Sequence, residues 1–292
     1  MTAAPAAPTA PRPAASVLLV RPGADSPVEV YLIRRQKSMR FLGGFYAFPG
    51  GKVEAADASD EALQCCRGIS AAAALEAFPA SDGLPPLAFW VTAARELVEE
   101  TGLLVGCEPD GRPVDTREPP VRERVERLRH ALVSEEAPFP ALLAREGWRL
   151  DLAPLRYLSH FITPPSSPIR FTARFFLSPV PTGQEPRLLG GEASEGFWID
   201  PAEGHRRFLA GEMQMAEPAD CGLRYLAGFD DLESVWTAHV DGRHKFHGIT
   251  DRIEAAGFSI PRGRRAGQAP HPQAPHPQAP HPHPLPFGER AG

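Results

Sequence analysis

The chain has 292 residues, of which 42% are hydrophobic, and a formal net charge of −5 at pH 7. Acidic and basic residues are well mixed, which argues against an extended nucleic-acid-binding surface, and no apolar stretch approaches the length of a membrane span. The N-terminus also lacks the apolar core of a signal peptide. We therefore expect a soluble, intracellular, cytoplasmic protein with neither nucleic acid nor a membrane as a partner.

The two ends of the chain differ in composition from the middle. Residues 1–15 are mainly Ala, Pro and Thr, and residues 261–292 repeat Ala-Pro-His-Pro-Gln after a short basic run. Neither segment has enough apolar residues to bury a core, so both are predicted to be disordered tails around one domain of residues 16–260. The histidines of the C-terminal tail are interpreted as part of an extended spacer rather than as metal ligands.

Apolar periodicity in the middle of the chain predicts a mixture of strands and helices. Strands are expected at residues 16–20, 28–35, 45–48, 103–105, 157–162, 170–180 and 197–200. Helices are expected at an acidic segment that ends near residue 101 and at residues 121–133, 201–210, 221–228 and 232–240. This alternation favours an α/β fold in which helices flank a mixed sheet.

The acidic segment, Arg-Glu-Leu-Val-Glu-Glu-Thr-Gly at residues 95–102, carries most of the functional information. Side chains three and four residues apart share one face of a helix, so Glu96, Glu99 and Glu100 are expected to crowd one patch. Mg²⁺ prefers oxygen ligands of this kind, and Mn²⁺ is a plausible substitute. Arg95 could hold a neighbouring carboxylate through paired hydrogen bonds. The alternative interpretation is a solvated helix face with ordinary ion pairs.

A Phe-Pro-Gly-Gly turn at residues 48–51 precedes the acidic segment. Without side chains, Gly50 and Gly51 allow the backbone to approach a phosphate or to offer a carbonyl to a metal ion. A plain surface helix needs no such turn. The two segments together therefore predict a divalent-metal site whose candidate ligands are Gly50, Glu96, Glu99 and Glu100.

Together the two segments resemble the Nudix box of the Nudix hydrolases, which is Gly, five residues, Glu, seven residues, Arg-Glu, apolar, any, Glu-Glu, any, Gly, apolar. Gly51 and residues 95–103 match this pattern, but Arg95 follows Gly51 by 95 − 51 = 44 residues rather than fourteen. The box is thus split by an insertion at about residues 55–87, which is rich in Ala and predicted to be helical. Leu87 stands eight residues before Arg95, and spacing leaves Glu54 and Asp57 as alternatives for the first Glu of the box.

A box split in this way resembles the coenzyme A and acyl-coenzyme A diphosphatase branch, of the peroxisomal coenzyme A diphosphatase type. The resemblance implies an αβα sandwich and hydrolysis, dependent on Mg²⁺ or Mn²⁺, of a diphosphate linkage in a small nucleotide derivative. The products from coenzyme A would be adenosine 3′,5′-bisphosphate and phosphopantetheine or its acyl form. ADP-ribose, NADH or another nucleoside diphosphate derivative is the alternative substrate. A Nudix-like module that binds a nucleotide without cutting it is the alternative to an enzyme.

Further site residues follow from the same resemblance. Arg40 belongs to a partly matching signature upstream of the box. Arg170 and Arg174, four residues apart in a predicted strand, would point to one face and could bind phosphates, although ordinary surface arginines are the alternative. Several Nudix hydrolases carry a metal ligand or base in the loop before a Trp-bearing strand, which favours Glu192 over Glu195. The candidate catalytic residues are therefore Arg95, Glu96 and Glu192, and Glu96 competes with Glu192 as the base.

Overall fold

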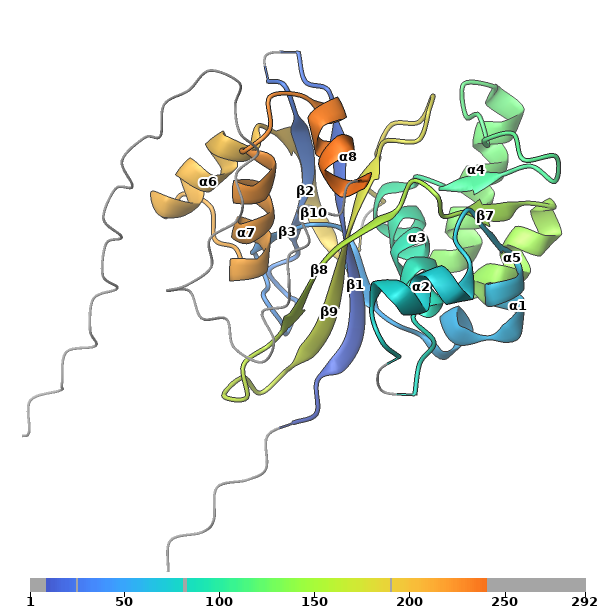
Figure 1. Ribbon diagram of the computed structural model, residues 1–292, viewed down its shortest axis with the longest axis horizontal. Coiled ribbons are helices and arrows are strands. Elements are labelled where there is room, and N and C mark those ends of the chain that lie inside the picture. Colours follow the sequence, from blue (N-terminus) through green and yellow to red (C-terminus); the bar gives the residue numbers. More distant parts are fainter. Residues whose placement is uncertain (1–8, 25, 81–82, 190, 241–292) are drawn as a thin grey trace, which may run out of the picture.

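A seven-stranded mixed sheet forms the centre of the fold (Figure 1). The computed structural model describes residues 9–240 apart from residues 25, 81, 82 and 190, so the predicted C-terminal tail lies outside the described residues. The main path of the sheet runs through β10 (Ala193–Ile199), β2 (Glu29–Arg35), β1 (Arg12–Arg21), β9 (Phe171–Pro179) and β8 (Arg156–Ile162). β1 and β9 pair in parallel, and the short strands β3 (Tyr46–Ala47) and β4 (Gly50–Lys52) extend β2 and β1.

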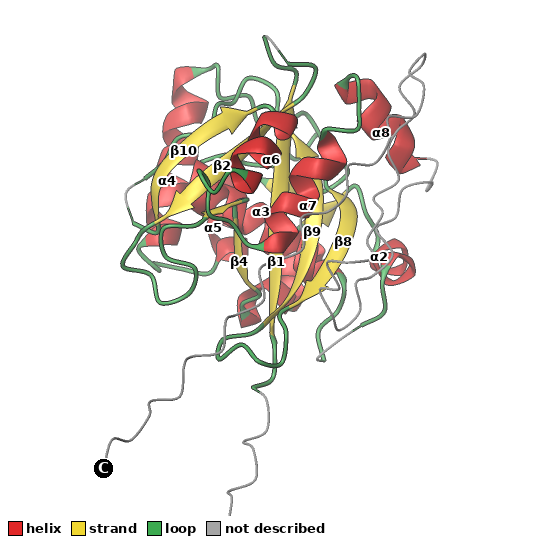
Figure 2. Ribbon diagram, turned by 90° about the vertical axis from the view of Figure 1, so that its left-hand side faces the viewer, coloured by secondary structure: helices red, strands yellow, loops and turns green. Residues whose placement is uncertain are grey.

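Helices cover both faces of this sheet, as Figure 2 shows for the face under α6 and α7. That face carries α6 (Pro201–Leu209), α7 (Glu217–Leu226) and α8 (Leu232–Val240), whereas α3 (Leu87–Thr101) covers the other face. Successive side chains of a strand point to opposite faces, so Val17 and Leu19 of β1 join the core under α3 and Leu18 joins the core under α7. The predicted αβα sandwich is confirmed.

The insertion in the box is part of a second lobe built around a small sheet. It begins within the 3₁₀ helix η1 (Ala55–Ala58) and contains α1 (Asp60–Gln64), β5 (Cys66–Arg67) and α2 (Ala71–Ala77), which agrees with the helical prediction. β5 pairs in parallel with β7 (Arg149–Asp151), and β7 pairs with β6 (Gly106–Cys107). The insertion is therefore anchored by backbone hydrogen bonds to a segment far along the chain.

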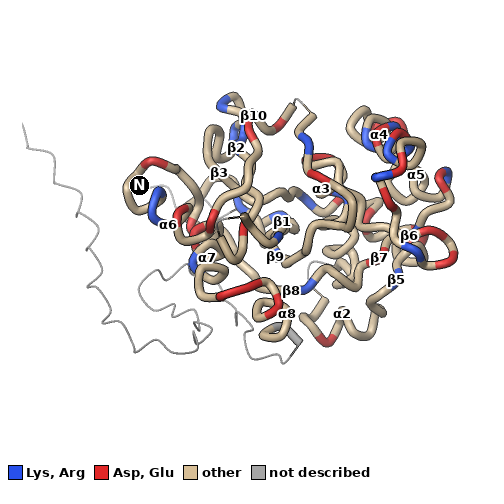
Figure 3. The backbone as a smooth tube through the Cα atoms, turned by 90° about the horizontal axis from the view of Figure 1, so that it is seen from above, with Lys and Arg blue, Asp and Glu red and all other residues tan. Residues whose placement is uncertain are grey.

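Two further helices, α4 (Pro119–Val133) and α5 (Phe139–Glu146), complete this lobe. The side chains of Val125, Leu128 and Leu132 are buried on one side of α4. Acidic and basic residues alternate along the rest of that helix (Figure 3). The predicted helix with one solvated, charged face is confirmed. No helix among the described residues is long and apolar enough to cross a membrane.

Strand β1 begins at Arg12, so the prediction that residues 12–15 belong to a disordered tail is wrong. The Pro and Ala composition of this segment is overridden by pairing on two sides. The Pro13 carbonyl accepts from Val53 N at 2.9 Å, and Ala15 lies opposite both Gly51 of β4 and Arg174 of β9. A small, fully buried residue such as Ala15 fits between these neighbours.

The strand predicted at residues 103–105 is absent, although all three side chains are buried. The Gln184 side chain takes the place of a neighbouring strand, because its Oε1 accepts from Leu104 N and its Nε2 donates to Leu104 O, each at 2.9 Å. β10 also differs from its prediction, since it starts at Ala193 and includes residues that were expected to form a loop. Its pairing with β2 contains a bulge between Ala193 and Glu195.

Candidate active site

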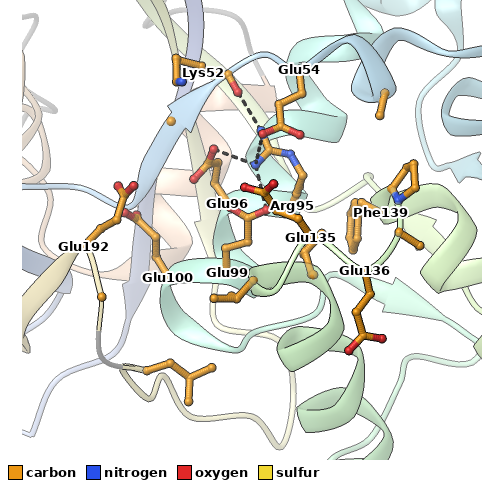
Figure 4. Close-up of a pocket in the computed structure, with 18 of the residues that line it drawn as sticks. Lys52, Glu54, Arg95, Glu96, Glu99, Glu100, Glu135, Glu136, Phe139 and Glu192 are labelled. Atoms are coloured by element: carbon orange, nitrogen blue, oxygen red, sulfur yellow. Dashed lines mark hydrogen bonds and ion pairs between the residues drawn. The ribbon is translucent and has the colours of Figure 1, made fainter.

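Arg95, on the buried side of α3, is the centre of the site (Figure 4). Its Nε and Nη2 donate to the Asp57 carboxylate at 3.0 and 3.1 Å, and Nη2 also donates to the Lys52 carbonyl at 2.7 Å. Its Nη1 lies 3.0 Å from Glu99 Oε1 and 2.9 Å from Glu96 Oε1. Arg95, with only 2% of its surface exposed, thus holds three carboxylates in fixed positions.

Asp57, rather than Glu54, is the acidic partner that the split box supplies to Arg95. The Asp57 carboxylate is fully buried and also accepts from Thr92 Oγ1 at 2.8 Å. The Glu54 side chain is 60% exposed and lies 4.0 Å from Arg95. Five residues separate Gly51 from Asp57, as in the ordinary box, so the insertion follows Asp57. Counting forward from Gly51 identifies this residue, whereas counting back from Arg95 meets Leu87.

The two glycines of the turn are required by close approach. A Cβ on Gly51 would lie 2.2 Å from Glu96 Oε1, and a Cβ on Gly50 would lie 2.3 Å from the Ala15 carbonyl oxygen. Gly50 N donates to Glu100 Oε2 at 2.7 Å. The turn therefore places the backbone of Gly51 against the Glu96 carboxylate and the backbone of Gly50 against the Glu100 carboxylate. A role for the Gly50 carbonyl as a metal ligand remains a prediction.

Burial and mutual repulsion raise the pKa values of the acidic side chains on α3. Burial raises the pKa of Glu100 to about 8; Glu192 and Glu99 add to this rise, while the Gly50 N–H and Arg35 oppose it. Burial also raises the pKa of Glu96 well above its ordinary range, against the lowering effect of Arg95. Additional positive charge beside these side chains would favour their ionised forms.

A cavity of about 670 Å³ opens beside these carboxylates. One wall is the turn with α3, and the other is the loop that joins α4 to α5. Seven acidic side chains line the cavity: Glu54, Glu96, Glu99, Glu100, Glu135, Glu136 and Glu192. Of these, Glu135 and Glu136 were not anticipated, and nothing in their local sequence points to the site. They reach it because α4 packs against the end of α3.

The chemistry of these donors suits Mg²⁺ or Mn²⁺, because all are carboxylate oxygens beside one cavity. Within residues 9–240, as far as the structure describes them, no group of three or more His, Cys, Asp or Glu side chains forms a ready metal-binding cluster. The reason is local: Glu96 and Glu99 contact Arg95, whereas Glu100 is turned toward Gly50 and Glu192. The expected crowding of three glutamates at the cavity is present, but their oxygen atoms do not converge on one point.

The structure separates the two candidate bases before the Trp-bearing strand. Glu192 lines the cavity and lies beside Glu100 (Figure 4), and its carbonyl accepts from Gln36 N at 2.7 Å. Glu195 instead lies 3.8 Å from Arg34, away from the residues that line the cavity. Only Glu192 of the two is therefore positioned to act at this cavity.

The three candidate substrate-binding arginines do not line the cavity. Arg40 is exposed in the turn between β2 and β3. Arg170 donates to the backbone carbonyls of Thr163 and Thr9 at 2.9 and 2.8 Å. Arg174 is buried, with its guanidinium 4.7 Å from the centre of the Phe78 ring. The alternation of side chains along a strand predicts which face of the sheet carries Arg174. It does not predict that Phe78 of the insertion packs over this side chain. Phosphate binding by the three arginines remains a prediction.

Comparison with known proteins shows what this chain is similar to. No family model matches the chain. The crystal structure of a Nudix hydrolase from Alicyclobacillus acidocaldarius is similar with a TM-score of 0.66 and 33% identity, and the match covers 78% of this chain and 96% of that one. The acyl-coenzyme A diphosphatase NUDT19 of Gallus gallus is 29% identical over 269 residues, which is 77% of this chain and 70% of the relative. A putative Nudix hydrolase 7 of Caenorhabditis elegans is 26% identical over 224 residues and is covered over 62% of its length.

The chain belongs to the Nudix hydrolase family. The 33% identity to the Alicyclobacillus protein, over nearly the whole of that protein, shows the relationship, and the αβα fold agrees with it. The expectation of an enzyme, a Nudix hydrolase acting on phosphorus-containing acid anhydrides, is confirmed at the level of the family. Within the family the chain resembles the coenzyme A diphosphatases, as the similarity to the Gallus gallus protein indicates.

Proposed function

We propose that this enzyme hydrolyses the diphosphate of coenzyme A or acyl-coenzyme A, with Mg²⁺ or Mn²⁺, to adenosine 3′,5′-bisphosphate and phosphopantetheine or its acyl form. The observation that carries the proposal is the acidic cavity, in which Arg95 and Asp57 fix the carboxylates beside the glycine turn. The 29% identity to an acyl-coenzyme A diphosphatase supports this substrate.

Each group at the cavity has a distinct part in the proposed reaction. Glu96, Glu99 and Glu100 would hold the divalent ion, which polarises the phosphoryl oxygens and offsets their charge when bound. Glu192 accepts a proton from the attacking water, because of Glu192 and Glu195 it alone lines the cavity. Arg95 borders the cavity but is almost fully buried, and we assign it as a positioning residue that keeps Glu96 and Glu99 oriented.

The test is product analysis after incubation of the purified protein with coenzyme A, an acyl-coenzyme A, ADP-ribose and NADH, each with Mg²⁺ or Mn²⁺. We expect preferential release of adenosine 3′,5′-bisphosphate from the coenzyme A substrates. Glu99→Gln and Glu100→Gln should lose most of this turnover while remaining folded. Preference for ADP-ribose or NADH would retain the metal site but reject coenzyme A as the substrate.

A matched pair of variants tests the role of Glu192. Removal of a general base lowers turnover by about 10²- to 10⁴-fold, so Glu192→Gln should lower kcat by an amount in this range. Glu195→Gln is the control, because Glu195 lies in the same segment but pairs with Arg34 outside the cavity. Equal kcat values for the two variants would reject Glu192, and a larger loss in Glu96→Gln would identify Glu96 as the base instead.

A further inference from the structure

A second cavity adjoins the acidic one on the side of the insertion. It has a volume of about 810 Å³ and lies between the start of the insertion and α5. Ala56 of η1 and Pro138, which precedes α5, line both cavities. The two spaces therefore share a boundary formed by these two residues.

The walls of this second cavity differ in chemistry from those of the first. Its α5 side presents small apolar residues, Pro140, Ala141 and Ala144, and Trp148 is also part of the lining. The charged residues in its lining are Glu61 and Arg149, which are opposite in sign. A space of several hundred Å³ with mainly apolar walls is typical of sites that bind small molecules.

Trp148, the largest residue of this lining, is fixed in place. Trp148 Nε1 donates to Glu108 Oε1 at 3.0 Å, and the Arg124 guanidinium lies 4.3 Å from the centre of its ring. Only 2% of the Trp148 surface is exposed. An apolar wall that is already rigid loses little side-chain freedom when a ligand binds.

We propose that the second cavity binds the uncharged arm of the substrate, namely the pantetheine chain with its thioester-linked acyl group. This inference rests on the proposed function. A diphosphate substrate carries two substituents, and the seven glutamates of the acidic cavity disfavour any additional anionic group beside the reacting phosphates. The adjoining cavity has balanced charge and apolar walls, so it accepts the substituent that is long, linear and uncharged.

The consequence for the molecule is that the insertion has a substrate-binding role. Ser59, Glu61 and Cys65, on one wall of the second cavity, belong to the inserted segment, whereas the other wall belongs to α5. The pairing of β5 with β7 fixes the two walls relative to each other. A box without this insertion would lack one wall and would leave the arm exposed to water.

Ala144→Phe tests the inference by filling the second cavity from α5. With octanoyl-coenzyme A we expect a rise in KM of about tenfold or more, because a well-packed apolar chain loses its site. With ADP-ribose, which has no such arm, the change should be much smaller. Arg145→Phe is the matched control, because Arg145 is exposed on the same helix and lines neither cavity.

The remaining outcomes separate the inference from the proposed function. Equal KM values for octanoyl-coenzyme A in Ala144→Phe and Arg145→Phe would overturn the inference while leaving the proposed function intact. A parent enzyme that cleaves ADP-ribose but neither coenzyme A nor its acyl forms would overturn both. Ala141→Phe fills the same cavity from a second exposed position, so misfolding of one variant does not prevent the test.

Discussion

The pair formed by Asp57 and Arg95 is the interaction on which the geometry of the site depends most. Asp57→Asn would deprive the buried Arg95 of its fully buried carboxylate partner, which accepts from both Nε and Nη2. Removing one partner of a buried ion pair typically destabilises a protein by about 3–5 kcal/mol, and we expect a loss of this size in the free energy of unfolding. Urea titration followed by circular dichroism measures it.

Glu54→Gln is the control for that prediction, because Glu54 also lies within reach of Arg95 but is mostly exposed. Exposed ion pairs contribute about 0–1 kcal/mol, so this variant should unfold at nearly the same urea concentration as the parent. Equal losses in the two variants would contradict the assignment of Asp57 as the principal partner of Arg95.

Glu100 gives the stability of the metal-free protein a specific pH dependence. Its folded-state pKa of about 8 lies above the ordinary value of 4.5, so the folded state binds its proton more tightly than the unfolded state. The resulting stabilisation is complete below about pH 4.5 and is lost as the pH rises to about 8. In the presence of EDTA, Glu100→Gln should therefore lose less stability than the parent between these pH values. Parallel stability curves for the two proteins would show that Glu100 does not titrate in this window.

Individual site residues are predictable only where a family pattern or the chemistry of a side chain specifies them. The rank of Glu192 over Glu195 comes from the resemblance to Nudix hydrolases, and the expected contact of Arg95 with a carboxylate comes from the chemistry of its guanidinium group. The sequence alone is sufficient to identify Asp57 as the first acidic residue of the box, since the ordinary spacing from Gly51 is retained before the insertion. The surroundings of Arg174 were not predictable, because they depend on how a distant segment packs.

At the scale of elements, two helices end in the same way but have different neighbours. Gly102 after α3 and Gly147 after α5 both adopt the left-handed conformation, with φ of 73° and 72°. A Cβ on Gly102 would lie 2.9 Å from Arg129 Nη1, whereas a Cβ on Gly147 would meet nothing within 4 Å. Arg129 in turn donates to the Glu99 carbonyl at 2.9 and 3.1 Å. The end of the acidic helix is thus held by a buried arginine from α4.

We expect Gly147→Ala to lower the free energy of unfolding by about 1 kcal/mol, which is the cost of the left-handed conformation alone. Gly102→Ala should cost more, because Arg129 must also move. Urea unfolding of the two variants measures the difference. Gly102→Ala should further reduce turnover, since Glu99 and Glu100 occupy the last turn of that helix. Equal losses of stability would show that the contact with Arg129 is unimportant.

Three helices are predicted close to their observed bounds. α8 is predicted at these bounds, and α4 and α6 are predicted to within two residues at each end. The basis is apolar residues at helical spacing in α4 and a proline at the first position in α6. The strand predicted at residues 103–105 is wrong because a run of apolar residues indicates that a segment is buried, but it does not indicate which group forms hydrogen bonds with the backbone of that segment. The partner here is a side chain, Gln184, about eighty residues away in the sequence.

At the scale of the whole molecule, the insertion shares its core with the rest of the domain, so it should unfold together with it. Ala74 of α2 is fully buried in the core that also contains Trp90 and Phe176, whereas Ala72 in the same helix is exposed. Ala74→Asp places an unpaired charge in this core and should lower the free energy of unfolding by more than about 3 kcal/mol. The transition should stay single when followed by fluorescence and by circular dichroism.

Ala72→Asp serves as the control and should leave the unfolding midpoint almost unchanged, since surface substitutions typically fall within about 0.5 kcal/mol. A separate early transition in Ala74→Asp would mean that the insertion folds on its own and that its contacts with α3 contribute little to the domain. The mixed sheet and its two covering layers were predictable from the alternation of elements, but the shared core of the insertion was not.

The contact between Asp57 and Arg95 spans 38 residues of sequence, whereas the ordinary spacing of the box is eight. The entropy of closing a flexible loop grows only with the logarithm of its length, so this lengthening costs roughly 1.4 kcal/mol. A few apolar contacts within the inserted segment offset a cost of this size. The length of the chain between Asp57 and Arg95 is therefore a weak constraint on this active site. The loop can become longer during evolution while the same two side chains remain in contact.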